Sequence, residues 1–237
     1  MSLQGRHILV TSGPTRAPLD AVRYLTNKST GRLGSLIAEA ALESGADVTF
    51  IYGRGSALPV VRGGRPDHLR LLPIHTVEDL VAVFRRELPR GYDAVIHLMA
   101  VLDFAPAEVS EEKVASSRAE WVIRLVPTPK AAALVRDLAP RTFFVGFKLE
   151  VGKDRDDLID IARDWARHNR ADLVVANDLR DIERGKHIGY LVTASGTVEA
   201  VVEGKEAIAR ALVDLLSRRL EGREPPGRRH SETGARR

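Results

Sequence analysis

The 237-residue chain contains no cysteine, few aromatic residues and no long apolar run. The missing cysteine excludes disulfide bonds and thiolate metal sites, and the seven histidines show no metal-ligand spacing. No segment is apolar enough to span a bilayer, and residues 1–6 lack the apolar stretch of a signal peptide. We therefore expect a cytoplasmic protein with no membrane partner.

Positive charge is concentrated at the C-terminus. The chain carries a formal net charge of +4, and residues 222–237, with five arginines and two glutamates, account for +3 of it. The remaining body is near neutral, which argues against a nucleic-acid partner. Because 237 residues with 44% hydrophobic content can bury a sizeable core, we predict one domain over residues 1–221. A disordered basic tail is predicted for residues 222–237.

Apolar segments of strand length alternate with amphipathic segments of helix length. Strands are predicted at 7–11, 47–52, 69–74, 93–100, 121–126, 142–147 and 172–176, and helices at about 36–44, 76–88, 129–138 and 156–169. This alternation is typical of an α/β fold with a mostly parallel sheet and helices on both faces. Residues 187–193 and 197–202 flank a turn signal and predict a C-terminal β-hairpin, and 205–220 predicts a closing helix.

A long loop follows the first strand and ends in Ser29, Gly31 and Gly34, where a helical pattern begins. The first N–H groups of a helix are unpaired and attract anions, so these residues predict a phosphate contact. An ordinary N-cap with glycines for close packing explains them equally well. The gap between Gly13 and Gly31 is too long for the dinucleotide-binding fingerprint, and loops of that length usually carry chemistry.

Polar residues follow four of the predicted strands. The first loop follows the strand at 7–11, and Asp103 follows the strand at 93–100. Phe147-Lys148 ends the strand at 142–147, and Asn177-Asp178 follows the strand at 172–176. The carboxyl ends of parallel strands meet at one edge of the sheet, where α/β proteins bind ligands. Each residue alone is more often a turn or a helix cap, but together they predict a site at that edge. A polar segment at about 102–120 is predicted to be a flap, and it carries Lys113.

Two early segments closely resemble the phosphopantothenate-cysteine ligases of coenzyme A biosynthesis: residues 9–16, LVTSGPTR, and residues 19–34, LDAVRYLTNKSTGRLG. Further matching segments follow in the same order: 99–104 (MAVLDF), 113–117 (KVASS), 128–130 (TPK), 146–150 (GFKLE) and 176–179 (ANDL). Together they cover nearly the whole chain up to the tail. The KVASS and GFKL segments look like the stand-alone form of the ligase.

The resemblance implies a Rossmann-like fold that forms a homodimer with active sites shared between subunits. It also implies a two-step ligation. CTP or ATP converts the carboxylate of phosphopantothenate into an acyl-nucleotidylate, and the amine of cysteine then displaces the nucleotide monophosphate. Mg²⁺ is the expected cofactor, because charge develops at phosphorus and must be stabilised. The flavin-dependent half of the bifunctional ligases has no counterpart in this sequence, so no FMN is expected.

The resemblance also implies roles for individual residues. Asn27 and Lys113 are expected to act in catalysis, Asn27 at the cysteine-transfer step and Lys113 from the flap. Phosphopantothenate is expected to contact Ala100, Asp103 and, across the dimer interface, Arg23. The expected nucleotide contacts are Ser29, Gly31, Gly34, Phe147, Lys148 and Asn177. No metal ligand is assigned.

The chain departs from the ligase family in its lysines. The flap has Lys113 in place of a lysine run, and Trp165 and Asn169 stand near positions where other members carry triphosphate-binding lysines. Arg163 and Arg167 are the candidate substitutes. The choice between CTP and ATP therefore stays open.

Two alternative functions follow from the same observations. An NAD(P)-dependent oxidoreductase is suggested by the Rossmann-like pattern and by Tyr24 and Lys28, whose spacing resembles the Y-x-x-x-K pair of short-chain dehydrogenases. In those enzymes, however, the pair lies on a later helix. A non-catalytic nucleotide-binding module is suggested by the reduced lysine set.

Overall fold

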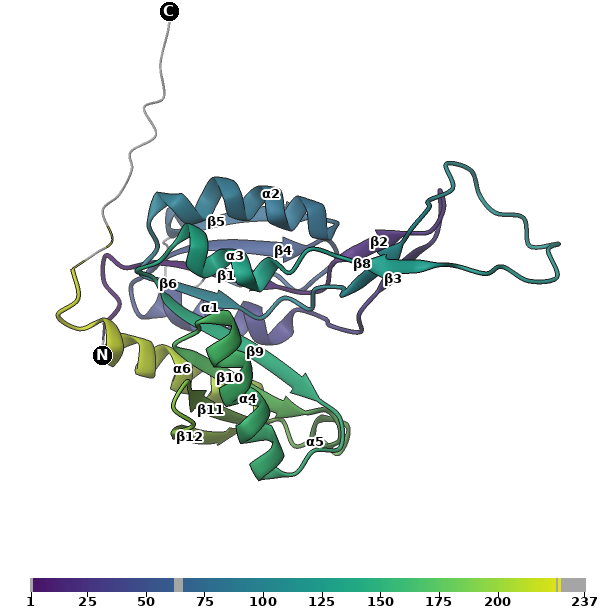
Figure 1. The fold of residues 1–237 in the computed structure, drawn as a ribbon. Helices are drawn as coiled ribbons and strands as arrows, with labels where there is room; N and C mark the ends of the chain where they lie inside the picture. The colour runs from purple at the N-terminus through teal and green to yellow at the C-terminus, as the bar shows by residue number, and fades with distance from the viewer. Residues whose placement is uncertain (1, 62–65, 225, 227–237) are drawn as a thin grey trace, which may run out of the picture.

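An eight-stranded sheet forms the centre of the computed structural model, which describes residues 2–61, 66–224 and 226 (Figure 1). Its strand order is β12-β11-β10-β9-β6-β1-β4-β5. The parallel strands are β1 (His7–Ser12), β4 (Asp47–Gly53), β5 (Leu69–Ile74), β6 (Ala94–His97), β9 (Phe143–Glu150) and β10 (Leu173–Asp178). The hairpin strands β11 (Ile188–Thr193) and β12 (Val198–Glu203) extend the sheet in antiparallel fashion. The predicted mostly parallel sheet with a C-terminal hairpin is confirmed.

The chain builds this sheet outward from β1. It adds β4 and β5 on one side and then crosses to the other side, where it adds β6, β9 and β10. The strand order therefore reverses between β1 and β6. Ligands of open α/β sheets bind in the crevice outside the carboxyl ends of the strands at such a reversal. The carboxyl ends of β1, β6, β9 and β10 share one edge, as the sequence predicts.

Helices cover both faces of the sheet (Figure 1). On one face, α1 (Arg32–Glu43) and α6 (Lys205–Leu220) pack over a core that includes Ile8 and Phe50. On the other, α2 (Val77–Glu87), α3 (Ala131–Leu138) and α4 (Arg155–Asn169) pack over a core that includes Phe144. The short helices are η1 (Pro66–His68), η2 (Leu88–Arg90) and α5 (Leu179–Glu183).

Two antiparallel ribbons lie beyond the carboxyl edge of the sheet (Figure 1). β2 (Arg16–Pro18) pairs with β3 (Tyr24–Thr26) inside the segment predicted as a long loop. β7 (Phe104–Pro106) pairs with β8 (Leu125–Pro127), and we call residues 104–127 the arm. Figure 1 shows the arm projecting away from the sheet, with the predicted flap segment forming much of it.

Two predicted strands differ from the observed ones for the same reason. The strand predicted at 121–126 is wrong as a core strand, because β8 (Leu125–Pro127) pairs with β7 of the arm and not with the central sheet. The strand predicted at 93–100 ends at His97, since the backbone of Ala100 bonds to the loop after β1. Apolar composition alone does not show which partner a strand pairs with.

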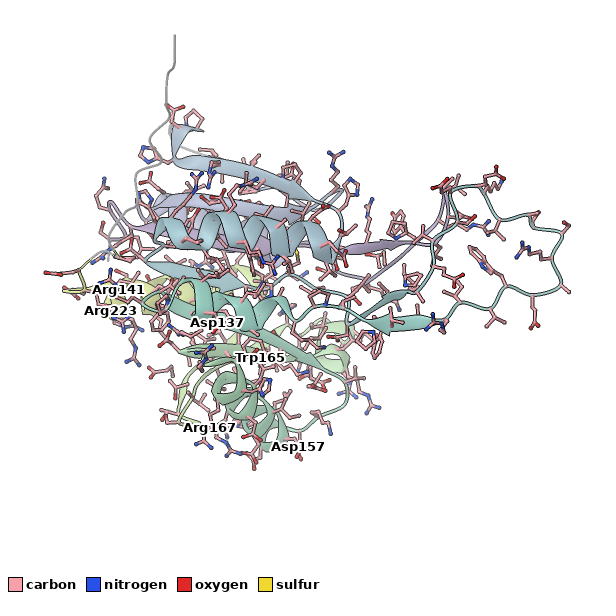
Figure 2. The ribbon with its side chains drawn as sticks, turned by 45° about the horizontal axis from the view of Figure 1, so that its top comes forward. Asp137, Arg141, Asp157, Trp165, Arg167 and Arg223 are labelled. Carbon is pink, nitrogen blue, oxygen red and sulfur yellow. The ribbon has the colours of Figure 1, made fainter. Side chains whose placement is uncertain are left out.

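Part of the predicted C-terminal tail contacts the sheet domain. Arg6 donates to the carbonyl oxygens of Leu220 and Arg223 at 2.6 and 3.0 Å. The guanidinium of Arg223, which Figure 2 labels, lies 5.6 Å from the centre of the Phe143 ring. Arg223 is thus held although it falls within the tail predicted as disordered. Residues 225 and 227–237 of that prediction lie outside the described residues. Within the described residues, no helix has both the length and the apolar character needed to cross a membrane.

Candidate active site

Ala100, just beyond β6, ties the first loop to the centre of the sheet. Its N–H donates to Gly13 O at 2.9 Å, and its carbonyl oxygen accepts from Thr15 N at 3.2 Å and from Asn27 Nδ2 at 3.1 Å. These bonds hold Asn27 where the strand order reverses, at the carboxyl ends of β1 and β6. Two residues predicted for the site, Asn27 and Ala100, are therefore in direct contact.

Ser29, Gly31 and Gly34 lead into the first turn of α1. Gly31 is the N-cap residue with φ of 75°, and its carbonyl oxygen accepts from Ser12 Oγ at 3.0 Å. A Cβ on Gly34 would lie 2.2 Å from Ser12 Oγ, so the glycine lets α1 approach β1 closely. Packing therefore explains Gly34, whereas Ser29 lines an open pocket.

The pocket beside Ser29 has a volume of about 210 Å³. Its walls come from the loop after β1 and the start of β2, from the end of β3 and the loop that follows it, and from the loop after β4. The lining residues are Pro14, Arg16, Thr26, Asn27, Lys28, Ser29, Arg54, Gly55 and Ser56. The lining includes three cationic side chains and no carboxylate, so it suits an anionic ligand. Arg16, Arg54 and Ser56 are not among the site residues predicted from the sequence. Arg16 lies in the segment 9–16, which resembles the ligase family. Arg54 and Ser56 follow β4, which ends at the carboxyl edge of the sheet.

Phe147 and Lys148 come from neighbouring positions of β9, so their side chains point to opposite faces of the sheet. Phe147 packs against the same apolar cluster as Leu33, in the first turn of α1. Lys148 Nζ pairs with Glu150 Oε1 at 2.9 Å. Of these two predicted nucleotide contacts, Phe147 is the one that shares a face with the N-terminus of α1.

Asn177 and Asp178, at the end of β10, hold neighbouring loops in place. Asn177 Nδ2 donates to Ile188 O at 2.7 Å. The Asp178 carboxylate accepts from the backbone N–H groups of Lys153 and Arg180, each at 2.8 Å, and caps α5. The hydrogen bond from the Lys153 backbone contributes most to lowering the pKa of Asp178, and the bond from Arg180 adds to it. Burial acts in the opposite direction. The nucleotide contact predicted for Asn177 stays a prediction.

Asp103 lies between β6 and the arm and forms an exposed ion pair with Lys130. The two charged groups are 2.5 Å apart, and both side chains are about two-thirds exposed. Thr128 N donates to Asp103 O at 3.0 Å, which fixes the same turn from the other side. Sequence reasoning missed Lys130 as a site residue, although it stands in the matched TPK segment.

Arg23 joins the β2–β3 ribbon to the arm. It pairs with the fully buried carboxylate of Asp20 at 2.8 Å, donates to Val114 O at 2.6 Å and stacks 4.7 Å from the Trp121 ring centre. Burial alone would raise the pKa of Asp20, but hydrogen bonds from the backbone of Val22, Val114 and Arg23, with the Arg23 charge, lower it to about 2. Within one chain, Arg23 therefore orders the arm.

Lys113 is exposed on the arm, next to the anchored Val114. Its ammonium group has no hydrogen bond or ion pair with the residues that the structure describes, and it is not among the residues that line the pocket. Within a single subunit, Lys113 is therefore not part of the pocket that Asn27 and Ser29 line.

The histidines and acidic residues offer no metal centre in the described ranges 2–61, 66–224 and 226. No group of three or more of their side chains there could hold an ion. His97, inside the sheet, has its Nδ1 atom 2.7 Å from Thr11 Oγ1. Burial lowers the pKa of His97 to about 4, so its ring is neutral at pH 7.

The chain matches the family model described as the DNA/pantothenate metabolism flavoprotein C-terminal domain, over residues 3–220. It belongs to this family. The coenzyme A biosynthesis bifunctional protein CoaBC of Thermococcus kodakarensis is 38% identical over 220 residues, which cover 92% of this chain and 53% of that protein. The chain thus spans about half the length of the curated relatives it matches. The resemblance indicated by the sequence motifs is confirmed at the level of the family.

Two solved structures extend the likeness to the fold of this flavoprotein C-terminal domain. The DNA/pantothenate metabolism flavoprotein from Streptococcus pneumoniae is 31% identical with a TM-score of 0.81, and the match covers 91% of this chain and 100% of that one. The C-terminal domain of a CoaBC protein is 27% identical with a TM-score of 0.71, covering 93% and 98%. The predicted α/β architecture is therefore shared.

In this member of the family, Arg167 does not reach the pocket. Its Nε donates at 3.0 Å to Ala194 O, in the turn between β11 and β12. That turn lies at the amino edge of the sheet, because Thr193 pairs with Leu173, the first residue of β10. Figure 2 shows Arg167 and Asp157 towards opposite ends of α4. The prediction that Arg167 replaces a triphosphate-binding lysine is wrong, since helix and strand run in opposite directions.

Trp165, Asn169 and Arg163 of α4 also contact other parts of the sheet domain or of the helix itself. The Trp165 ring fills the space above Gly146, where a Cβ would lie 2.0 Å from the ring. Asn169 Nδ2 donates to Trp165 O at 3.0 Å. Arg163 pairs with Asp164 at 3.1 Å on the same helix. None of these side chains lines the pocket, and the substitution predicted for Arg163 stays a prediction.

The Tyr24 and Lys28 pair does not have the geometry of an oxidoreductase pair. Tyr24 lies in strand β3, so a four-residue spacing does not place the two side chains on successive turns of a helix. The Tyr24 ring instead packs beneath the Arg16 guanidinium, 4.3 Å from its centre. The specific motif behind the oxidoreductase alternative is therefore absent from this family member.

Proposed function

We propose that this domain is a phosphopantothenate-cysteine ligase of coenzyme A biosynthesis. In the first step, the carboxylate of phosphopantothenate attacks the α-phosphate of CTP or ATP, which releases pyrophosphate and leaves an acyl-nucleotidylate. In the second step, the amine of cysteine attacks the acyl carbon and releases the nucleotide monophosphate. Family membership and the coenzyme A function in the names of its relatives support the proposal.

The hydrogen bond from Asn27 Nδ2 to Ala100 O is the observation that carries the proposal. It fixes Asn27 at the strand-order reversal, beside Ser29 and the cationic pocket. A ligation must hold two anionic substrates in one reactive geometry and offset their charge, and this arrangement can do both. Asn27 would orient the activated acyl group, and Ser29 with the first N–H groups of α1 would contact the nucleotide phosphates.

Phosphopantothenate would lie between Ala100 and Asp103, at the base of the arm. The ion pair with Lys130 would hold the Asp103 carboxylate in one position while it accepts hydrogen bonds from the substrate. On the other side of the crevice, Phe147 would contact the nucleotide from the face that it shares with α1. Asn177, at the end of β10, would complete this side of the site, as the resemblance implies, and the nucleotide contact expected of Lys148 would come from the opposite face of β9.

The active form is proposed to be a homodimer in which the arm reaches a partner subunit. Exposed apolar side chains gather on the ribbon and the arm, with Val22 60%, Phe104 52% and Val122 80% exposed. Such patches mark protein contacts. A partner would also bring Lys113 and Arg23 to the second active site. Sedimentation of the full chain is expected to give a dimer, and a chain without residues 107–124 is expected to give a monomer.

Mg²⁺ is expected to enter with the nucleotide. Magnesium in nucleotide enzymes is commonly held by substrate phosphates and by one or two carboxylates, so the ion needs no residue cluster of its own. FMN is not part of the proposed reaction. The visible absorption spectrum of the purified protein is expected to show no flavin band.

The test measures pyrophosphate released from CTP or from ATP. We expect no release without phosphopantothenate, a single turnover when cysteine is left out, and continuous release when all substrates are present. The ratio of kcat/KM for the two nucleotides decides the natural substrate. No release with either nucleotide would refute the proposal. Nucleotide binding without release would instead identify a non-catalytic module, and enhanced NADPH fluorescence would favour the oxidoreductase.

A further inference from the structure

The pocket between the loops that follow β1, β3 and β4 gathers cationic side chains from separate segments. Arg16 comes from β2, Lys28 from the loop before α1, and Arg54 from the loop after β4. Among the described residues, none of the three has an ion-pair partner, whereas the nearby Arg23 pairs with Asp20. The pocket therefore concentrates positive charge that no ion pair within residues 2–61, 66–224 and 226 balances.

Two buried polar atoms of this pocket also lack a hydrogen-bond partner in the part of the chain that the structure describes. They are Arg16 Nε and Ser56 Oγ. A buried donor without an acceptor is costly, and a ligand oxygen would supply the acceptor. The Tyr24 ring holds the Arg16 guanidinium from one side, at 4.3 Å, so the donor is already oriented.

Backbone contacts, and not the charged groups, set the shape of the pocket. Gly13 has φ of 75°, and a Cβ there would lie 1.8 Å from Ser56 Oγ, so the loop after β4 rests directly on the loop after β1. Ala57 N donates to Thr30 O at 2.9 Å and ties the same loop to the start of α1. The fold thus holds like charges close together, which favours an anionic ligand.

We propose that Arg16, Lys28 and Arg54 bind the phosphate groups of a substrate, with Ser29 and Ser56 as hydroxyl donors. The guanidinium groups can each donate two parallel hydrogen bonds to phosphate oxygens, and the lysine adds a point charge. This inference rests on the proposed ligase function, but the family resemblance assigns no role to these three cations.

The phosphate could come from either of two substrates. One source is the triphosphate of the nucleotide, and the other is the phosphate monoester of phosphopantothenate. Both would carry their charge to the carboxyl edge of the sheet, where the pocket lies. Arg167 of α4 does not serve there, since it is bound at the opposite edge.

Calorimetric titration of the full chain with inorganic pyrophosphate tests the pocket without turnover. Arg54 is exposed, so Arg54→Gln should fold normally, and thermal unfolding checks this. We expect the affinity for pyrophosphate to fall by about 10- to 100-fold, the usual effect of losing charge-assisted hydrogen bonds. Arg141→Gln removes an exposed arginine outside the pocket, labelled in Figure 2, and should bind as the wild type does. Equal affinity of Arg54→Gln and the wild type, or binding to neither, overturns the proposal.

Steady-state kinetics then distinguish the two sources. If the triphosphate occupies the pocket, Arg54→Gln raises KM for the nucleotide and leaves KM for phosphopantothenate near the wild-type value. If the monoester occupies it, the two effects are exchanged. Unchanged KM values for both substrates contradict the proposal. Should the wild type show no turnover, the ligase proposal fails, and the pyrophosphate titration still decides whether the pocket binds phosphate.

Discussion

The substitution Gly34→Ala separates a packing role from a ligand-binding role. The new Cβ would lie 2.2 Å from Ser12 Oγ and 2.5 Å from Ser12 Cβ, and both residues are buried. Contacts this short force α1 and β1 apart, and such overpacking typically costs about 1–3 kcal/mol. For a chain of this size each kcal/mol lowers Tm by about 2–4 °C, so we expect a fall of about 2–12 °C.

Thermal unfolding of three variants measures the effect. They are Gly34→Ala, Ser12→Gly and the double variant. Ser12→Gly removes both atoms that clash with the new Cβ. The double variant should therefore lose less stability than the sum of the losses of the two single variants, by about 0.5–3 kcal/mol. An unchanged Tm for Gly34→Ala, together with a higher KM for the nucleotide, would refute the packing explanation and favour a phosphate contact.

Three further predictions concern catalysis, the arm and the core. Asn27→Ala should slow cysteine transfer more than activation, so mass spectrometry should detect accumulated acyl-nucleotidylate; equal slowing of both steps without an intermediate would contradict this role. Arg23→Ala removes the ion pair with Asp20 and should speed proteolysis within residues 107–124, and unchanged cleavage would argue against it. Because burial lowers the pKa of His97 from 6.5 to about 4, the unfolded chain binds this proton more tightly, and stability should fall by about 3 kcal/mol as the pH drops from 6.5 to 4. Denaturant unfolding should show a flatter profile for His97→Leu, and an equal slope would exclude His97 as the cause.

Elements with strong local signals were predictable from the sequence. The helix predicted at 205–220 is α6, with the same bounds. The Thr76 side chain accepts from Asp79 N and Asp79 accepts from the Thr76 backbone, so this capping box fixes the start of α2. Such features depend on residues a few positions apart, which a sequence displays directly.

Elements whose partners are distant were less predictable. The segment 121–126 has the composition of a strand, but its neighbour is β7 of the arm, and no local pattern states that pairing. The short ribbon β2–β3 was predicted as a loop, since three-residue strands leave almost no periodic signal. In both cases the tertiary contacts of the strand decided its place.

The sequence by itself determined the family and the order of the strands and helices outside the ribbon and the arm, and it predicted a role for the stretch around Asn27 and Ser29. Only the tertiary structure decided which side chains share an edge. It brought Arg54 to Arg16 and left Arg167 at the opposite edge, and it showed that Gly34 faces Ser12. The physical reason is that strand order and register join residues far apart in the chain, whereas sequence patterns report on residues close together.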